Sequence, residues 1–408
     1  MTDAQAEDLK ITRYDINIVL FCVALTIVQL FGIDMYIPSM PWIKESLHTS
    51  QMVVQLTIAL YTLGAALSVL FSGPLSDKVG RKPVIMLGLV VMLFGGLICL
   101  FAFDGPMLLV GRIIQGIGAG FCMSANRAVV TDIFSAKKLA IIGAYFGTIA
   151  SVSPIFAPII GGYLEHYFNW RANFVVLTAC YLILLITTQL FFNETIHTRH
   201  PDKLSITFIL KRYVQLIIKS DFRIYAICGG LTLGVSIAYA TAAPYIFEKT
   251  LHMSPITFGW LGIFVGAGNI FGKLTTPFLV KRFKMQSVII AGLLIILLTG
   301  IFFALALSFN WLSVSLALAA IIATMFAQSY VAGNAFALGI TPYRHIGGAA
   351  NALFASSQMG LAFMISGVLS LSSDHVPESS ALAGMYIAIG GICLLLFLRY
   401  SLKRKSAG

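Results

Sequence analysis

The chain has 408 residues, of which 58% are hydrophobic and only 11% charged, and its mean hydropathy is +0.91. A soluble domain is typically about 45–50% apolar and about 25% charged, so this composition excludes a soluble enzyme. The formal net charge of +11 is of the kind that marks the cytoplasmic loops of a membrane protein. The composition therefore predicts an all-α polytopic membrane protein, with the lipid bilayer as its surroundings and without a nucleic-acid partner.

The apolar residues fall into runs long enough to cross a bilayer, which takes about 20 residues per helix. Residues 1–15 lack the basic start of a cleaved signal peptide, so the first run is expected to stay in the protein. Because the number of runs is even, both termini are expected on one side. The twelve predicted spans are residues 16–40, 52–72, 83–103, 107–130, 139–163, 171–192, 222–247, 256–276, 285–307, 311–333, 345–371 and 381–400.

The basic residues predict which side that is. With cytoplasmic termini, only Lys44, Arg171 and Lys249 of the 27 lysine and arginine residues fall in loops on the outer side. Cytoplasmic loops carry an excess of lysine and arginine. The sequence thus predicts a multi-pass protein of the bacterial inner membrane with both termini in the cytoplasm.

Span one contains Asp34, the only acidic residue well inside a predicted span. Ionisable groups in a membrane are costly and usually face a cavity, where they bind ions or relay protons. The alternative places Asp34 at a helix end near the headgroups. The apolar run continues beyond it through Pro38 and Pro41, which favours a position about two helical turns inside the outer end.

Residues 73–83, between spans two and three, read GPLSDKVGRKP. An aspartate at a helix end accepts hydrogen bonds and pairs with basic residues, and a glycine permits a tight turn. An ordinary basic loop is the alternative. The segment resembles the signature loop of the major facilitator superfamily, which implies twelve transmembrane helices in two six-helix bundles. The resemblance also implies a gating loop built on Gly73, Asp77, Gly80 and Arg81.

Span four carries a stripe of polar residues. Its first half, residues 109–120, reads LVGRIIQGIGAG, similar to a second motif of that superfamily. At about 100° per residue, the later polar residues fall within about 60° of Arg112 around the helix. A polar stripe in a membrane helix faces water or another helix, so Gln115, Asn126 and Arg127 are predicted to line a substrate cavity. Arg127 alternatively snorkels to the headgroups.

Span five contains SPIFAPIIGG at residues 153–162. This resembles the antiporter motif of the superfamily, in which a Gly-Pro pair precedes a Gly-Gly pair. Ser153 and Ala157 replace the usual glycines, so the match is partial. The resemblance implies a helix bend at Pro154, Pro158, Gly161 and Gly162.

Two further segments narrow the resemblance. Residues 33–38 read IDMYIP, and residues 127–132 at the inner end of span four read RAVVTD. Together they resemble the Bcr/CflA-type drug–proton antiporters, which include MdfA-like multidrug exporters. One departure is that a second membrane acid of the MdfA-like proteins is replaced here by Thr26.

The connection from Asn193 to Asp221 is the longest and divides the chain. It predicts an N-terminal six-helix bundle over 1–192, a cytoplasmic linker over 193–221 and a C-terminal bundle over 222–408. The linker pattern suits an amphipathic helix on the membrane surface, although a plain solvated linker fits nearly as well. A shift of 203 residues aligns Pro74 with Pro277, a weak sign of an internal repeat.

In the second half, Tyr239 and Asn269 are predicted to complete the substrate cavity, together with Tyr61 of the first half. Aromatic packing between helices is the alternative for the tyrosines. The chain has no GxxxxGK[ST] loop for ATP and no CxxC pair or His/Cys cluster for a metal. We therefore expect no cofactor, no metal and no enzyme activity, and an ion gradient as the source of energy.

The sequence favours a monomeric, proton-coupled exporter of small hydrophobic drugs or metabolites that works by alternating access. Asp34 and Arg112, at comparable predicted depths, are the expected proton-coupling pair. Burial disfavours an ionised carboxylate and a nearby arginine favours it, so substrate and proton would compete for Asp34. A purely structural ion pair is the alternative. The alternative function is a transporter dedicated to one endogenous solute or siderophore, acting as an exporter or an importer. A receptor or a structural protein is a different class, and it would need neither Asp34 nor a bent span five.

Overall fold

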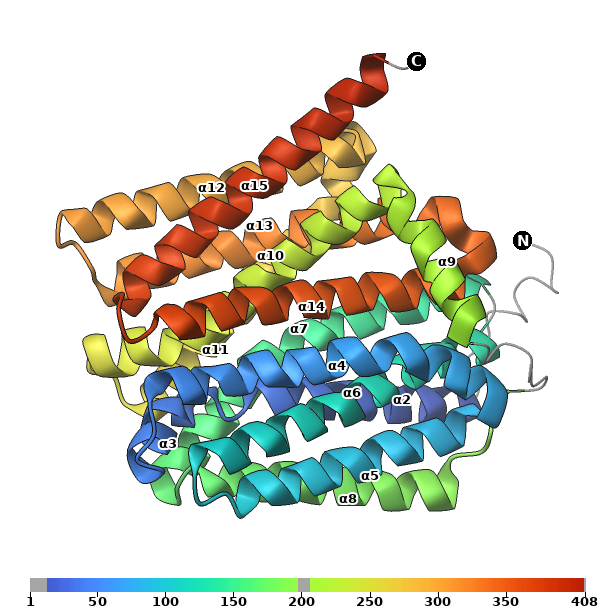
Figure 1. The fold of residues 1–408 in the computed structure, drawn as a ribbon, viewed down its shortest axis with the longest axis horizontal. Helices are drawn as coiled ribbons and strands as arrows, with labels where there is room; N and C mark the ends of the chain where they lie inside the picture. Colours follow the sequence, from blue (N-terminus) through green and yellow to red (C-terminus); the bar gives the residue numbers. More distant parts are fainter. Residues whose placement is uncertain (1–12, 135, 197–205, 407–408) are drawn as a thin grey trace.

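The computed structural model describes residues 13–134, 136–196 and 206–406, and this part of the chain contains helices and no strand (Figure 1). The first half holds α2 (Arg13–Asp34), η1 (Ile37–Ser39), α3 (Met40–Ser46), α4 (Gln51–Val79), α5 (Arg81–Leu100), α6 (Gly105–Ile133), α7 (Ala136–Tyr167) and α8 (Arg171–Phe191). The second holds α9 (Ile206–Ile218), α10 (Ser220–Pro244), η3 (Tyr245–Thr250), α11 (Pro255–Arg282), α12 (Met285–Ser308), α13 (Val314–Ile340), η4 (Thr341–Ile346), α14 (Gly347–Ser372) and α15 (Glu378–Ser406).

Eleven helices in the described part of the chain are long and apolar enough to cross a membrane. The twelfth long helix of the bundle is α7, which has 32 residues and packs against α2 and α11; the side chains of residues 139–151 within it lie outside the described part. The predicted all-α membrane fold with twelve spans in two six-helix bundles is confirmed.

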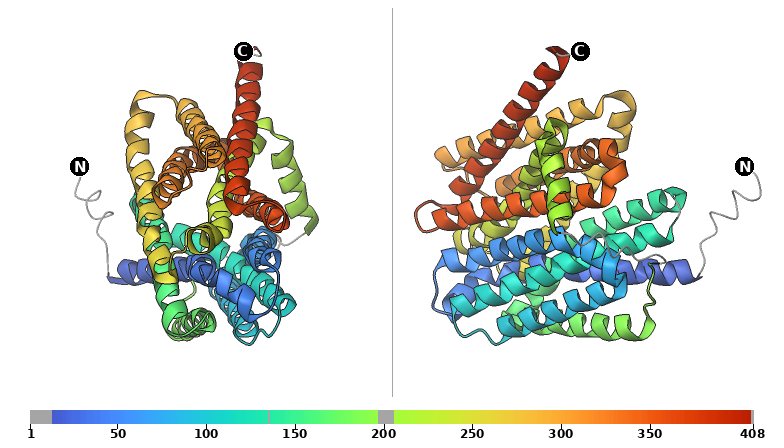
Figure 2. Two further views of the ribbon diagram at one scale, coloured as in Figure 1. Left: turned by 90° about the vertical axis from the view of Figure 1, so that its left-hand side faces the viewer. Right: turned by 45° about the vertical axis from the view of Figure 1, so that its right-hand side comes forward.

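The two bundles lie side by side, with α2 and α4 to α8 in one and α10 to α15 in the other (Figures 1 and 2). They meet mainly along two helix pairs, α4 with α14 and α7 with α11. We call the end of the bundles that holds the start of α2 and the end of α15 the terminal face, and the other end the opposite face. The short helix α9 lies at the terminal face, where Tyr213 Oη donates a hydrogen bond to the carbonyl of Leu70 at 2.7 Å.

Capping residues explain where several helices begin. At four starts on the opposite face, a side-chain oxygen accepts a hydrogen bond from the backbone N–H three residues later, which satisfies one of the free donors of a helix N-terminus. The distances are between 2.8 and 3.3 Å, and the four caps are Ser50, Asp104, Ser254 and Ser313.

The first predicted span is not one continuous helix. The α-helix ends at Asp34, and the chain continues through the 3-10 turn η1 into α3. Proline at the start of both η1 and α3 explains this break, because proline cannot donate the backbone hydrogen bond that would extend the preceding helix. Asp34 thus lies at a helix end, in agreement with the alternative interpretation of the sequence. The residues that follow it, however, are buried in the protein.

Candidate functional site

Asp34 lies at a small cavity between the two bundles. Its Oδ2 atom accepts a hydrogen bond from Ser153 Oγ of α7 at 3.2 Å. The cavity has a volume of about 80 Å³, and among its lining residues only Asp34 carries a charge. The structure therefore brings together Asp34 and two other predicted residues, Tyr239 and Asn269. The rest of the lining is mostly apolar and includes Ile37, Pro154, Pro158, Phe258, Val265 and Met325.

Arg112 occupies a different environment, inside the first bundle. It is fully buried, and its guanidinium carbon lies 4.4 Å from the ring centre of Tyr36 and 4.6 Å from that of Tyr61. Its Nη1 atom donates to Gln115 Oε1 at 2.7 Å, while Nε and Nη2 have no hydrogen-bond partner among the described residues. No ion pair joins Arg112 to Asp34 in the described structure. The predicted coupling pair is thus not in direct contact in this conformation.

Tyr61 links these two environments. Its ring covers Arg112, its hydroxyl donates to the carbonyl of Gln29 at 2.9 Å, and it lies within electrostatic reach of both Arg112 and Asp34. Tyr61 and Gln115 therefore belong with Arg112 rather than with the small cavity, whose lining contains neither. That they line a substrate cavity remains a prediction; for Gln115, the helical angle gives the polar face of α6 but not the helix that covers it.

The predicted polar stripe of α6 continues into two further environments. Asn126 Nδ2 donates to the carbonyl of Cys22 at 2.8 Å and to Thr26 Oγ1 at 3.0 Å, so it fastens α6 to α2 instead of lining a cavity. Thr26 is thus part of a helix–helix contact. Arg127 extends into a larger cavity at the terminal face.

The predicted gating loop forms a charged cluster at the terminal face. Arg81 Nη1 pairs with Asp77 Oδ1 at 2.6 Å, and Arg81 Nε pairs with Asp132 Oδ2 at 2.8 Å. Arg81 Nη1 also donates to Ser76 Oγ at 2.7 Å. Arg81, which is only 6% exposed, joins α5 to the ends of α4 and α6. Charge-assisted pairs that are shielded from water are stronger than surface pairs.

Glu194 completes this cluster from the end of the first bundle. Its carboxylate accepts hydrogen bonds from the backbone N–H groups of Arg81 and Lys82 at 2.9 and 3.2 Å, at the start of α5. Gly80 has a φ of +112°, and a Cβ atom there would meet the Glu194 carboxylate. Only glycine adopts this conformation readily, so Gly80 allows both the turn and the cap.

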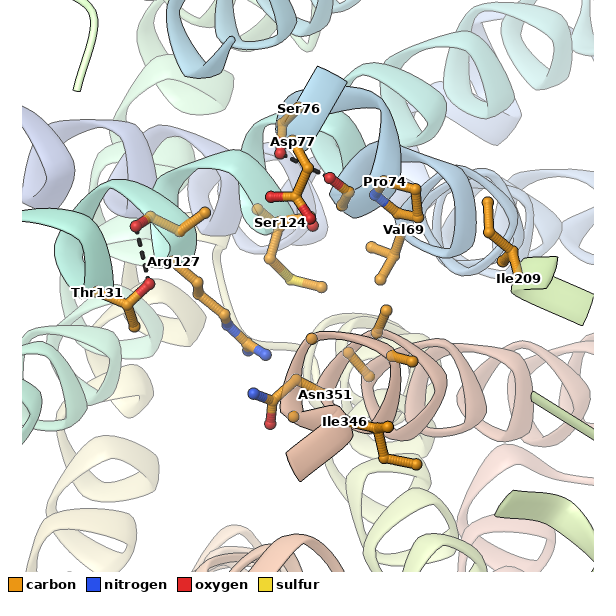
Figure 3. A pocket seen from close by; sticks show the side chains of 18 of the residues that line it. Val69, Pro74, Ser76, Asp77, Ser124, Arg127, Thr131, Ile209, Ile346 and Asn351 are labelled. Atoms are coloured by element: carbon orange, nitrogen blue, oxygen red, sulfur yellow. Dashed lines mark hydrogen bonds between the residues drawn. The ribbon is translucent and has the colours of Figure 1, made fainter. Parts of the chain in front are cut away.

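The larger cavity has a volume of about 580 Å³ and lies between the two bundles at the terminal face. Figure 3 shows the Arg127 side chain pointing across it towards Asn351 of α14. Of the predicted gating residues, Gly73, Asp77 and Arg81 line this cavity. The other lining residues come from α4 and α6, from α9 and from the start of α14, and include Ser124, Thr131, Ile209, Arg212, Tyr213, Gly347 and Gly348.

The predicted bend residues of α7 lie against the second bundle and the Asp34 turn. Pro158 has no N–H to donate to the carbonyl of Pro154, four residues earlier. That carbonyl faces Gly262 of α11, where a Cβ atom would lie only 2.6 Å away. Gly161 faces the carbonyl of Met35, directly after Asp34. The motif therefore permits two close backbone contacts, one between the bundles and one with the turn that carries Asp34.

The opposite face is held closed by polar contacts between the bundles. Trp42 Nε1 donates to Glu248 Oε2 at 3.2 Å, and Gln55 Nε2 donates to Glu378 Oε1 at 2.8 Å, where Gln51 also donates. Glu248 and Glu378 are 7% and 9% exposed. A typical hydrogen bond contributes about 0.5–1.5 kcal/mol, so these contacts favour closure of this face.

A second layer of contacts surrounds this closure. Lys249 pairs with Glu45, and its Nζ lies 5.0 Å from the ring centre of Trp42. Nearby, Gly162 packs directly against the carbonyl of Pro255 at the start of α11.

Sequence reasoning missed the role of Glu248 and Glu378, which the predicted span limits assign to loops. The available signal was that Glu248 directly follows one apolar run and Glu378 lies three residues before another, so a short extension of either span would have placed them inside the protein.

The match to known families agrees with this architecture. The model of the Major Facilitator Superfamily matches residues 22–367. The chain belongs to the major facilitator superfamily. The superfamily that the loop at residues 73–83 suggested is thus confirmed, and the protein is a transporter rather than an enzyme.

This major facilitator protein has distant curated relatives of matching length. It is 24% identical to multidrug resistance protein MdtL of Citrobacter koseri over 378 residues, which covers 92% of this chain and 93% of the relative. It is also 24% identical to MdtL of Klebsiella pneumoniae over 384 residues, with coverage of 92% and 93%.

Solved transporters share the fold at lower sequence identity. A D-xylose–proton symporter aligns with a TM-score of 0.73 at 16% identity, covering 93% of this chain and 96% of the other. A POT family transporter crystallised with 5-aminolevulinic acid aligns with a TM-score of 0.76 at 11% identity, covering 96% and 97%. These similarities support the major facilitator fold and carry no information on substrate.

Proposed function

We propose that this protein is a proton-coupled exporter of small hydrophobic drugs or metabolites in the bacterial inner membrane, acting as a monomer with both termini in the cytoplasm. The observation that carries the proposal is the position of Asp34, a carboxylate at an otherwise uncharged cavity between the two bundles. The names of the MdtL relatives support drugs as the substrate class.

Alternating access follows from the state of the two faces. The terminal face holds the 580 Å³ cavity, whereas polar and backbone contacts close the opposite face. With the terminal face in the cytoplasm, this is an inward-facing conformation. Substrate enters from the cytoplasm, and a rocking motion of the bundles then closes the terminal face and opens the opposite one.

Asp34 couples the two fluxes in this proposal by accepting either a proton or a substrate. An ionised Asp34 attracts a substrate into the cavity beside Tyr239 and Phe258. A proton that arrives from the outside neutralises Asp34, which removes this attraction and releases the substrate. The hydrogen bond from Ser153 orients the carboxylate. Opening to the cytoplasm then lets the proton leave, which restores the binding form.

Arg112 acts in this scheme through Tyr61 rather than as the direct partner of Asp34. Two of its nitrogens lack partners in the described structure, and a buried cation without an ion pair is costly to folding. We infer that Arg112 is present for transport at the expense of stability. Its guanidinium favours negative charge nearby, and Tyr61 lies against Arg112 and within electrostatic reach of Asp34.

Arg112→Met is accordingly expected to leave the protein at least as thermally stable as the wild type but unable to pump. The substitution removes a buried charge while it keeps most of the side-chain volume, and such changes are often neutral or stabilising. Thermal unfolding in detergent and transport in proteoliposomes are the two measurements. A fall in the melting temperature with normal transport would make Arg112 a structural residue only.

Asp77→Asn is expected to slow turnover while substrate binding persists. The change weakens the pair with Arg81 that joins α4 to α5 at the terminal face. The loop at residues 73–83 is then no longer held in one position. The measurements are substrate binding to the purified protein and turnover in proteoliposomes, with the exposed Lys78→Gln in the same loop as control. Unchanged turnover would remove the loop from the mechanism.

The combination of Trp42→Phe with Gln55→Leu is expected to open the opposite face. Each change removes a donor to a buried glutamate of the other bundle, and a loss of about 1.4 kcal/mol already shifts such an equilibrium tenfold. Spin labels at Phe103 and Phe309, in opposite-face loops of the two bundles, should report a new population at longer distance. The exposed Trp260→Phe serves as control, and an unchanged distribution would contradict the assignment of these contacts as a gate.

The experiment that tests the proposed function is drug susceptibility and dye efflux in a host that lacks its own efflux pumps. Expression of the chain should raise resistance to hydrophobic drugs and lower dye retention. A proton uncoupler should abolish the efflux. Efflux that persists with the uncoupler would contradict proton coupling, and no resistance to any drug would favour a dedicated endogenous solute.

A further inference from the structure

Arg127 is a cation without a partner in the terminal-face cavity. It forms no hydrogen bond or ion pair through its side chain with any described residue, in contrast to Arg81 in the same lining. Figure 3 shows it extended across the cavity from α6 of the first bundle towards Asn351 of α14. The Oδ1 atom of Asn351 is itself buried without a hydrogen-bond partner.

The charge of the lining is positive. Its charged residues are Asp77, Arg81, Arg127 and Arg212, and the one carboxylate among them is already paired with Arg81 at 2.6 Å. Arg127 therefore pairs with no carboxylate of the described wall, in which arginines outnumber the single aspartate. A cavity in which one sign of charge predominates concentrates ligands of the other sign.

The start of α14 adds backbone donors on the other side of the cavity. Gly347 and Gly348 form the first turn of this 26-residue helix, and both line the cavity. A Cβ atom at either position would meet nothing within 4 Å. The N-terminus of a long helix favours negative charge, and here the first turn of α14, which directly follows the 3-10 helix η4, lines the same space as Arg127.

Helix α9 forms the third wall and relates the cavity to the membrane surface. Ile209, Arg212 and Tyr213 of α9 line the cavity, while four of its apolar side chains are exposed on the outside of the protein. Such a helix lies at the boundary between headgroups and acyl chains, and basic pockets at that level bind anionic headgroups. The exposed apolar residues are Leu210, Val214, Ile217 and Ile218.

We propose that the terminal-face cavity binds a phosphate group, held between Arg127 and the start of α14. The volume of about 580 Å³ lies within the range of about 300–1,000 Å³ that is typical of small-molecule sites. The phosphate comes either from an anionic phospholipid that enters beside α9 or from a soluble phosphate compound. A phosphate here touches both bundles and so stabilises the open terminal face, a role separate from that of Asp34.

The first experiment compares purified wild-type protein with Arg127→Gln, Arg127→Lys and Arg282→Gln. The last variant removes an exposed arginine at the terminal face, outside the cavity lining. Native mass spectrometry with added phosphatidylglycerol measures the population with bound lipid, and glycerol 3-phosphate in a thermal-shift assay measures a soluble phosphate. Phosphatidylcholine, which has no net charge, serves at the same concentration as the control for lipid binding that does not depend on charge.

Loss of a charge-assisted hydrogen bond predicts about tenfold weaker binding to Arg127→Gln. Arg127→Lys, which keeps the charge, should retain part of the binding, and Arg282→Gln should equal the wild type. A response to phosphatidylglycerol alone identifies a lipid as the source, and a response to glycerol 3-phosphate identifies a soluble compound. Equal binding by Arg127→Gln and Arg282→Gln to both ligands would overturn the proposal.

A second variant keeps the proposal testable if Arg127→Gln does not fold. Gly348→Asp places a carboxylate in the first turn of α14, where space is available and where acids stabilise a helix. The new carboxylate competes with a phosphate for Arg127, so binding should fall while the melting temperature is kept or raised. Gly348→Asn, without the charge, should bind as the wild type does. Equal phosphate binding by the Asp and Asn variants would contradict the site.

Discussion

Asp34→Asn is expected to abolish export driven by a pH gradient while the protein still folds and inserts. The amide keeps the size of the side chain and can still accept the hydrogen bond from Ser153, but it cannot ionise. The cavity then contains no titratable carboxyl group in its described lining. Dye transport into inverted vesicles with an imposed proton gradient measures the effect.

Two further variants show whether the loss of transport is specific to the carboxyl group of Asp34. Asp374→Asn, in an exposed loop at the opposite face, removes an acid that the mechanism does not use and should transport as the wild type does. Asp34→Glu keeps a carboxyl group in an altered position and should retain part of the activity. Gradient-driven transport by Asp34→Asn at the wild-type rate would place the coupling site elsewhere.

Gly262→Leu is expected to stop the transport cycle by preventing closure of the opposite face. A Cβ atom at this position would lie 2.6 Å from the carbonyl of Pro154 in α7, and a leucine side chain needs far more room. Since α7 and α11 separate there when the opposite face opens, the variant should fold in an outward-facing conformation and remain in it.

Gly384→Leu is the matched control for this substitution, because a Cβ atom there would meet nothing within 4 Å and the residue is exposed on α15. Transport by the control should be normal and transport by Gly262→Leu should fall to background. Spin labels at Phe103 and Phe309 should show only the longer distance for Gly262→Leu. Normal transport by this variant would make the close α7–α11 contact incidental.

Local patterns predicted the fold. The twelve apolar runs correspond to the long helices because length and hydropathy alone define a membrane span. The tight turn expected at Gly80 is present, and Asp77 pairs with Arg81 directly across that turn rather than with a basic residue across the bundle. Such features depend on residues that are close in sequence, so no knowledge of the tertiary arrangement is needed.

Contacts between distant residues were not predictable in the same way. The donors to Glu248 and Glu378 come from 206 and 323 positions earlier in the chain. The helical angle placed Arg112 and Asn126 on one face of α6, but the structure covers one with tyrosine rings and the other with α2. The pattern gives the polar face of a helix, while packing decides whether that face meets water, a ring or a neighbouring backbone.

The direct exchange of a proton for a substrate at Asp34 is the central claim, and proton release from the purified protein tests it most directly. Addition of a transported drug to the detergent-solubilised wild type, in weakly buffered solution with a pH indicator, should release protons in proportion to the drug bound. The Asp34→Asn variant should release none, while Asp374→Asn should match the wild type. Proton release by Asp34→Asn at the wild-type level would contradict the proposed mechanism.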